Sequence, residues 1–160
     1  MIRTPSAISG WNICAGGRDS HVQQRISATV VMADIRIAEM TADAGDVQRA
    51  IENARAVVNT LVENDERFMR SAATAVLVQS LLLRGSVADL REVATEIERL
   101  AAVPTDPGFV PNEIQLLRMR ALLARAHGDE AGHRDFTDRY AAMARSLAFE
   151  GHMAIAEAMR

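Results

Sequence analysis

The sequence predicts an all-α protein: a right-handed solenoid of about three antiparallel helix pairs, followed by a C-terminal capping helix. Three observations support this prediction: a composition suited to packed helices, apolar residues at helical spacing, and a turn signal that recurs along the chain. Hydrophobic residues make up 49% of the 160 positions and charged residues 24%, which is typical of a folded globular domain. Aromatic residues reach only 4%, and the Ala, Leu, Val and Met that dominate suit helix packing better than a sheet.

Three segments have the apolar pattern of amphipathic helices. Between Val47 and Leu61, apolar residues recur at offsets of 0, 3, 4, 7, 10, 11 and 14, which places them on one face of a helix. The segments 87–100 and 136–147 have the same kind of pattern. We therefore expect three outer helices, each with one face in the core and the other in water.

Each amphipathic segment follows one that is apolar on most sides, at about 21–41, 66–84 and 112–127. A helix that is apolar all round lies inside a structure, so these segments are expected to be the inner helices. A glycine and a capping residue separate the two helices of each pair: Gly45-Asp46, Gly85-Ser86 and Gly128-Asp129. Their steps of 40 and 43 residues predict a tetratricopeptide-like repeat with two helices per unit.

The repeats are expected to fill one domain at residues 20–160. The preceding residues 1–19 are rich in Ser, Gly and Pro without a sustained period, which predicts a flexible leader. A last helix at about 150–159 is expected to cap the stack.

A loop rich in proline is expected between the second and third pairs. The segment 103–111 contains too many prolines for a helix. Asn112 and Gln115 follow it with the spacing of a capping box, so the fifth helix is expected to begin with them.

The last third of the chain resembles a known family. The residues that carry the resemblance are Pro107-Gly-Phe-Val, Leu116-Leu-Arg-Met-Arg-Ala-Leu-Leu-Ala-Arg-Ala-His-Gly-Asp129, Arg134-Asp-Phe-Thr-Asp-Arg-Tyr140 and Leu147-Ala-Phe-Glu-Gly-His-Met-Ala154. They are similar to the C-terminal tetratricopeptide-like region of large actinobacterial regulators. Those regulators join an adenylate or guanylate cyclase domain, or a LuxR-type DNA-binding domain, to an AAA-like ATPase core.

The resemblance implies the scaffold arm of such a regulator, without its active parts. The sequence has no cyclase domain, no Gly-Lys-Ser/Thr phosphate loop and no basic recognition helix. We therefore expect a non-catalytic protein-interaction or scaffold module in signalling or transcription regulation. The alternative is a subunit of a nucleotide-dependent regulator, a cyclase or LuxR-type ATPase, whose catalytic or DNA-binding domains are on another chain.

Charge and cysteine content restrict the partners. The formal net charge is −3, so no general field draws the chain to nucleic acid or anionic lipid. All 18 basic residues are arginine, which excludes a P-loop lysine and a Schiff-base lysine, and no cofactor is expected. The single cysteine, Cys14, favours the cytoplasm. The longest apolar stretch, 72–83, is too short for a membrane span.

Two clusters of polar residues could be interpreted as a metal site or an acid–base site, but each has a simpler structural interpretation. His127, Asp129 and His133 lie close together, but zinc-binding helices place histidines four residues apart, so an ordinary helix junction is favoured over a metal site. A second cluster combines two acids with two arginines at four-residue spacing, which predicts ion pairs on a solvated helix face rather than acid–base chemistry: Arg134 with Asp138 and Asp135 with Arg139.

Polar residues within the inner helices are the best candidates for binding a protein or peptide partner, because solenoids present these helices on their concave side. Four residues qualify: Arg36, Gln79, Arg118 and Arg120. The alternative is that they only extend into solvent past their apolar stems. Arg118 and Arg120 are two residues apart, about 200° around a helix, so only one of them can face the concave side.

The N-terminal end of the stack is expected to be open. The first inner helix would expose apolar residues there unless something covers them: Ile26, Val30, Val31 and Ile37. A homo-oligomer formed through this uncapped end is therefore a further expectation.

Overall fold

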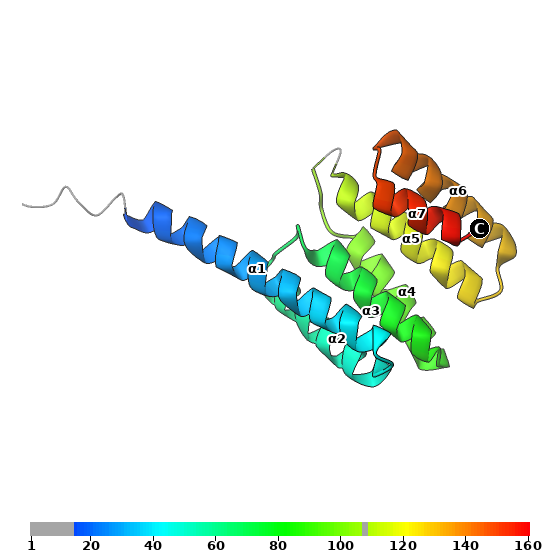
Figure 1. Ribbon diagram of the computed structural model, residues 1–160, viewed down its shortest axis with the longest axis horizontal. Helices are drawn as coiled ribbons and strands as arrows, with labels where there is room; N and C mark the ends of the chain where they lie inside the picture. Colours follow the sequence, from blue (N-terminus) through cyan, green and yellow to red (C-terminus); the bar gives the residue numbers. More distant parts are fainter. Residues whose placement is uncertain (1–14, 107–108) are drawn as a thin grey trace, which may run out of the picture.

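The chain folds into α-helices joined by short turns. The computed structural model describes the backbone of residues 15–106 and 109–160, and side chains from residue 28 onward within these ranges. These residues form seven helices and no strand (Figure 1), which confirms the all-α prediction. The helices are α1 (Ala15–Asp43), α2 (Val47–Glu63), α3 (Arg70–Arg84), α4 (Val87–Ala101), α5 (Val110–Ala126), α6 (Glu130–Ser146) and α7 (Glu150–Ala158).

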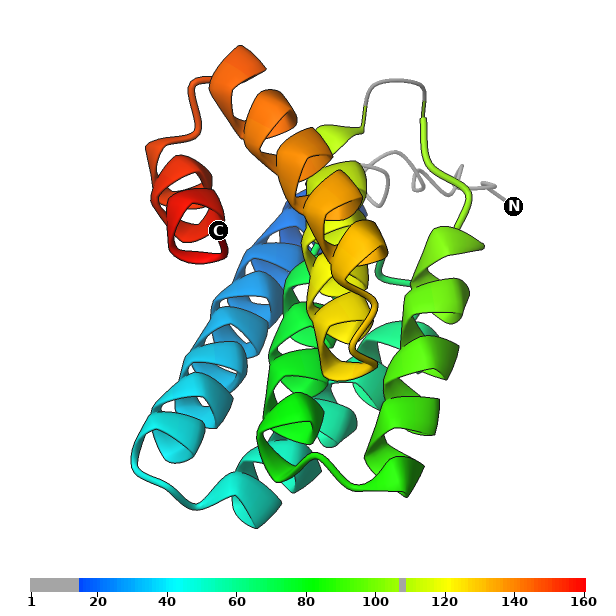
Figure 2. The same cartoon turned by 90° about the vertical axis from the view of Figure 1, so that its right-hand side faces the viewer.

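Each helix packs against the next one along the chain, and two further contacts decide the arrangement. α3 touches both α1 and α5, so these three helices form a continuous row. α2, α4 and α6 lie beside this row, and α7 packs on α6 (Figure 2). The row formed by α1, α3 and α5 is the surface on which a candidate site is found below.

The predicted glycine turns are present between α1 and α2, between α3 and α4, and between α5 and α6. Three glycines at these turns have a positive φ of +88°, +69° and +72°: Gly45, Gly85 and Gly128. L-residues rarely adopt this conformation, which explains why glycine ends these helices. The next residue in each turn accepts a hydrogen bond from a backbone N–H in the first turn of the following helix: Asp46, Ser86 and Asp129.

The amphipathic pattern predicts the core well. Six of the seven expected residues of α2 are buried: Ala50, Ile51, Ala54, Val57, Val58 and Leu61. In α4, Val93, Ile97 and Leu100 are buried, but Val87 is 67% exposed. Val87 is the first residue of its helix, so the inclusion of Val87 in the apolar face is wrong.

The starts of α1 and α3 differ from the sequence prediction. α1 begins at Ala15, inside the predicted leader, and residues 1–14 lie outside the described residues. Its N-terminal half projects beyond the other helices (Figure 1). α3 begins only at Arg70, because Asp65 has φ +49° and the Glu66 carboxylate accepts a hydrogen bond from the backbone N–H of Phe68.

The predicted capping box of the fifth helix is wrong. α5 begins at Val110 and takes Pro111 into its first turn, where a missing N–H costs no helical hydrogen bond. Asn112 therefore lies inside the helix and is 3% exposed. Neither the Asn112 Oδ1 nor the Gln115 Oε1 has a hydrogen-bond partner among the described residues.

Within the described residues, no helix is both long enough and apolar enough to cross a membrane.

Candidate functional site

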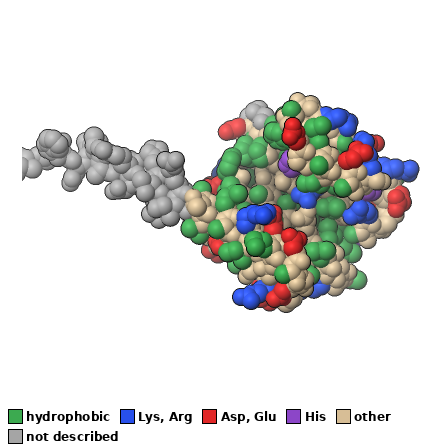
Figure 3. Space-filling model, viewed as in Figure 1, with side chains coloured by type: hydrophobic (Ala, Val, Ile, Leu, Met, Phe, Trp, Pro, Cys, Tyr) green, Lys and Arg blue, Asp and Glu red, His purple; other side chains and the backbone are tan. Residues whose placement is uncertain are grey.

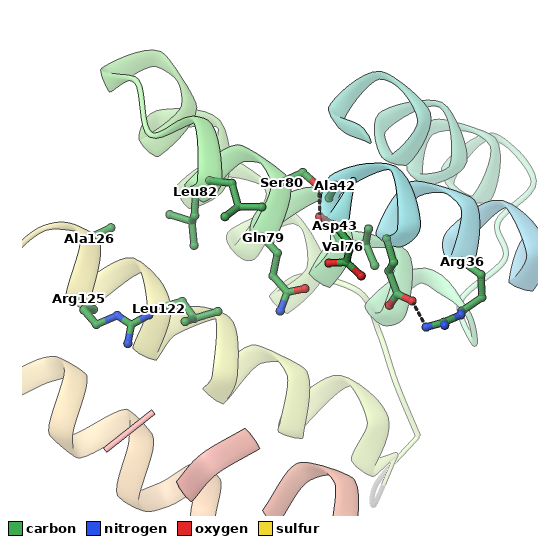
Figure 4. Close-up of a pocket in the computed structure, with 12 residues that line it drawn as sticks. Arg36, Ala42, Asp43, Val76, Gln79, Ser80, Leu82, Leu122, Arg125 and Ala126 are labelled. Carbon is green, nitrogen blue, oxygen red and sulfur yellow. Dashed lines mark hydrogen bonds and ion pairs between the residues drawn. The ribbon is translucent and has the colours of Figure 1, made fainter. Parts of the chain in front are cut away.

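A groove of about 720 Å³ lies between α1, α3 and α5 (Figure 4). The position of the groove follows from helix periodicity. On each helix the residues that line the groove are mostly three or four positions apart, so they lie on one side of that helix. The residues that give the groove its chemistry are Arg36, Glu39 and Asp43 on α1, Gln79 and Leu83 on α3, and Leu122 and Arg125 on α5.

The groove combines apolar walls with polar groups that are free to bind. Leu82, Leu83 and Leu122 contribute apolar surface, and Figure 4 shows Gln79 directed from α3 toward α5. Within the described part of the chain, Gln79 and Arg125 have no hydrogen bond or ion pair to another side chain. Such a mixture of apolar surface with a few polar groups is typical of ligand sites.

Acidic and basic side chains both lie along the groove. Arg36 forms an ion pair with Glu39, three residues further along the same helix. Asp43 lies on the same wall, and Arg125 lies across from it on α5. Acidic and basic side chains are also interspersed over the face seen in Figure 3.

Arg118 lies on α5, one helical turn before Leu122, on the side of the helix that lines the groove. Its side chain is partly buried, and the Nε atom has no hydrogen-bond partner in the described structure. Burial lowers the pKa of Arg118, while the nearby Tyr140 and the Glu39 carboxylate act in the opposite direction. The guanidinium stays protonated. A partly desolvated cation therefore lies on α5 one helical turn before Leu122, next to the groove.

Tyr140 and His152 adjoin Arg118. The Tyr140 side chain is fully buried, and its hydroxyl lies 2.7 Å from Nδ1 of His152, which links α6 to α7. The two rings meet edge to face, with centroids 5.7 Å apart. Burial lowers the pKa of His152, and the positive charge of Arg118 lowers it further. Burial also raises the pKa of Tyr140.

The structure brings three of the four predicted binding residues to the same side of the helix row. Arg36 and Gln79 line the groove, and Arg118 lies one turn beyond it. Arg120 lies elsewhere, with Nη2 at 3.8 Å from Glu98 Oε1 on α4. The separation of Arg118 from Arg120 follows from the 200° between them, as the sequence indicated.

Sequence reasoning missed several groove residues. Glu39 and Asp43 repeat the spacing of Arg36 along α1, and Arg125 follows Arg118 by two turns. This spacing of charged residues along inner helices was the available signal.

The two polar clusters have structural roles. The ring of His133 is buried, with Nδ1 2.9 Å from the carbonyl oxygen of Ala121 and Nε2 3.0 Å from that of Met159. It therefore ties α6 to α5 and to the C-terminal end. In the second cluster, Asp135 and Arg139 form the predicted ion pair at 3.3 Å.

The other predicted pair in this cluster is wrong. Arg134 donates to the carbonyl oxygen of Glu130 instead, and Asp138 lies 3.7 Å from Arg160. The described residues contain no group of three or more His, Cys, Asp or Glu side chains that could hold a metal ion.

The depressed pKa of His152 predicts that α7 is held less firmly in acid. A histidine with a lowered pKa in the folded state binds fewer protons there than in the unfolded chain, so its stabilising effect is complete above about pH 6.5 and declines below it. Amide hydrogen exchange of α7 should therefore be faster at about pH 5.5 than at about pH 7.5, after correction for intrinsic rates. His152→Asn retains an acceptor for Tyr140 and should remove most of this pH dependence. An equal dependence in the variant would contradict the assignment.

Comparison with known proteins gives no further identification. No family model, no curated protein and no solved structure matches this chain.

Proposed function

We propose that the chain is a non-catalytic protein-interaction module and that the groove between α1, α3 and α5 is its binding surface. The observation that carries this proposal is the groove itself: about 720 Å³, bordered by apolar side chains and by polar groups such as Gln79 and Arg125. A segment of another protein can bury its apolar side chains there and satisfy the polar groups. The partner is a protein or peptide.

The proposed architecture is a right-handed, tetratricopeptide-like solenoid of three antiparallel pairs with α7 as its cap. Two observations support it: the recurrence of the glycine turns at 40 and 43 residues, and the packing of α3 against both α1 and α5. In such a stack the inner helices line a concave surface, which is where solenoids bind their partners.

The proposed setting is a signalling or transcriptional regulator in the cytoplasm, of which this chain is a stand-alone or truncated arm. The support is the family resemblance of the last third of the sequence. The alternative, a subunit of a nucleotide-dependent regulator, predicts that ATP or GTP raises the melting temperature, because a ligand that binds only the folded state stabilises it.

Peptide selection tests the binding surface. Random dodecapeptides displayed on phage should yield a family that binds the wild-type protein. Leu83→Asn should weaken the selected peptides at least about tenfold, because Leu83 lines the groove and is 65% exposed. Val87→Asn is the matched control, since Val87 is 67% exposed on α4 and lies outside the groove. Equal affinities for both variants would place the peptide elsewhere, and the failure of any peptide to bind would contradict the proposed function.

We also propose that α1 pairs with a second copy of the chain. Val30, Ile37 and Met40 are 53%, 52% and 63% exposed, and with Ala33 they repeat every three or four residues, as in a helix–helix seam. Val31 is partly buried against the core, and the Ile26 side chain lies outside the described residues. Sedimentation equilibrium should show a dimer that Ile37→Asp converts to a monomer. A wild-type monomer at high concentration would contradict this pairing.

A further inference from the structure

The guanidinium of Arg118 is a partly buried cation without a matching anion. Several other arginines in the described residues reach a carboxylate on another helix: Arg55 meets Glu92, Arg84 meets Asp89, and Arg120 lies near Glu98. No carboxylate lies within 4.0 Å of Arg118 in the described structure, and its Nε has no hydrogen-bond partner. Removing a charge from water without pairing it is unfavourable, so an anion that reaches Arg118 gains more than one on an open surface.

Arg118 lies where a bound segment can reach it. On α5 it shares one side of the helix with Leu122 and Arg125, both of which line the groove. Across the groove, Glu39 of α1 also lines the cavity and is close enough to affect the pKa of Arg118. The site therefore continues the groove at the end where α7 packs on α6.

We propose that Arg118 recognises a carboxylate side chain on the protein segment that occupies the groove. This inference rests on the proposed function and adds the chemistry of the partner to it. The planar guanidinium presents a fork of N–H donors that matches the two oxygens of one carboxylate. Tyr140 and His152 already hydrogen-bond each other at 2.7 Å beside it, so Arg118 is the donor that stays available for the ligand.

The surrounding charges favour a carboxylate over a phosphate group. On the α1 wall of the same groove, Glu39 is paired with Arg36, and Asp43 adds a further negative charge, so the wall has a net charge of about −1. A phosphate carries close to two negative charges at neutral pH and would be repelled more strongly by this wall than a single carboxylate. A free phosphate is therefore expected to compete poorly with the peptide.

The position of Leu122 predicts which type of residue lies near the acidic residue in the bound peptide. It lies one turn after Arg118, about 6 Å along the helix axis. An extended peptide covers this distance with two residues, so an acidic residue with an apolar residue two positions away is the expected motif. Residues 1–14 of the chain contain no Asp or Glu, which favours another protein as the source.

A double-substitution cycle tests the site with a peptide selected on the wild-type protein. The selected family should contain a recurrent Asp or Glu. Changing that acid to its amide should weaken binding to the wild type by about tenfold to a hundredfold. The same change should have almost no effect on binding to Arg118→Met, which retains an apolar stem. Arg120→Met is the matched control, because Arg120 lies on the same helix but outside the groove, near Glu98 of α4, and the acid should retain its full effect in this variant.

The outcomes separate this inference from the proposed function. Two results would overturn the carboxylate site while still supporting the groove as the binding surface. In the first, the selected peptides depend on Leu83 but have no recurrent acidic residue. In the second, the acidic residue has the same effect on binding to Arg118→Met as on binding to the wild type. Failure to select any peptide would overturn both. If Arg118→Met does not fold, the Arg118 guanidinium resonances of the wild type give the answer. They should shift with the acidic peptide and not with its amide form, and millimolar inorganic phosphate should not reproduce the shift.

Discussion

Replacing Leu81 by alanine should lower the free energy of unfolding by about 3 kcal/mol. Leu81 is fully buried in α3, in a cluster that also receives side chains from α1, α2 and α4. Because α3 packs against α1, α2, α4 and α5, it cannot move to close the space that the side chain leaves. Urea denaturation monitored by circular dichroism at 222 nm measures this change.

Leu83→Ala is the matched control for this prediction. It removes the same atoms two residues further along the same helix, from a side chain that is 65% exposed. Its expected effect is below about 0.5 kcal/mol. Similar losses in both variants would contradict the orientation of α3, and with it the assignment of the groove to the opposite side of the helix row.

Replacing Asp89 by alanine is expected to cost about 2 to 3 kcal/mol, because this carboxylate has two structural roles. It accepts a hydrogen bond from the backbone N–H of Ser86, while its own N–H donates to the Ser86 hydroxyl, which completes a capping box at the start of α4. It also accepts two hydrogen bonds from the Arg84 guanidinium at the end of α3. Its side chain is only 1% exposed, so water does not replace these bonds in the folded protein.

The same residue predicts a loss of stability in acid. The hydrogen bonds from Arg84, followed by those of Ser86, hold the pKa of Asp89 well below its usual range. A lowered pKa stabilises the folded state fully above about pH 4 and progressively less below it. The difference in unfolding free energy between wild type and Asp89→Ala should therefore shrink between pH 7 and about pH 3. Asp135→Ala, at an exposed ion pair with Arg139, should cost less than about 0.5 kcal/mol at either pH.

Local signals account for the parts of the fold that the sequence predicts. The turns at Gly45, Gly85 and Gly128 depend on one glycine and one capping residue each, and both requirements act within a few residues. The buried face of α2 follows equally from its spacing, since a helix with one apolar face has one way to bury it.

The start of α5 was predicted wrongly because two local rules conflicted. Asn112 and Gln115 have the spacing of a capping box, but Val110 and Pro111 can already adopt helical geometry. The helix therefore begins earlier and carries Asn112 into the interior, where it is 3% exposed. Burial by tertiary contacts decided between the two starts, and a local pattern contains no information about those contacts.

The candidate site was predictable only in part. The inner-helix argument located Arg36 and Gln79 in the groove because it depends on which side of a helix a residue occupies. The isolation of Arg118 from any carboxylate depends on distances between α1, α5 and α6, which are set by packing. The same holds for the contact of Tyr140 with His152 across two helices.

The most direct test of the central claim is to map a selected peptide onto the protein by NMR. Titration of the ¹⁵N-labelled wild-type chain should shift the backbone amides of α1, α3 and α5 around the groove, among them those of Asp43, Gln79 and Leu122. The amides of α2 and the exposed face of α4 should not respond. Shifts confined to α2 and α4, with the groove residues unchanged, would contradict the claim that the row of α1, α3 and α5 is the binding surface.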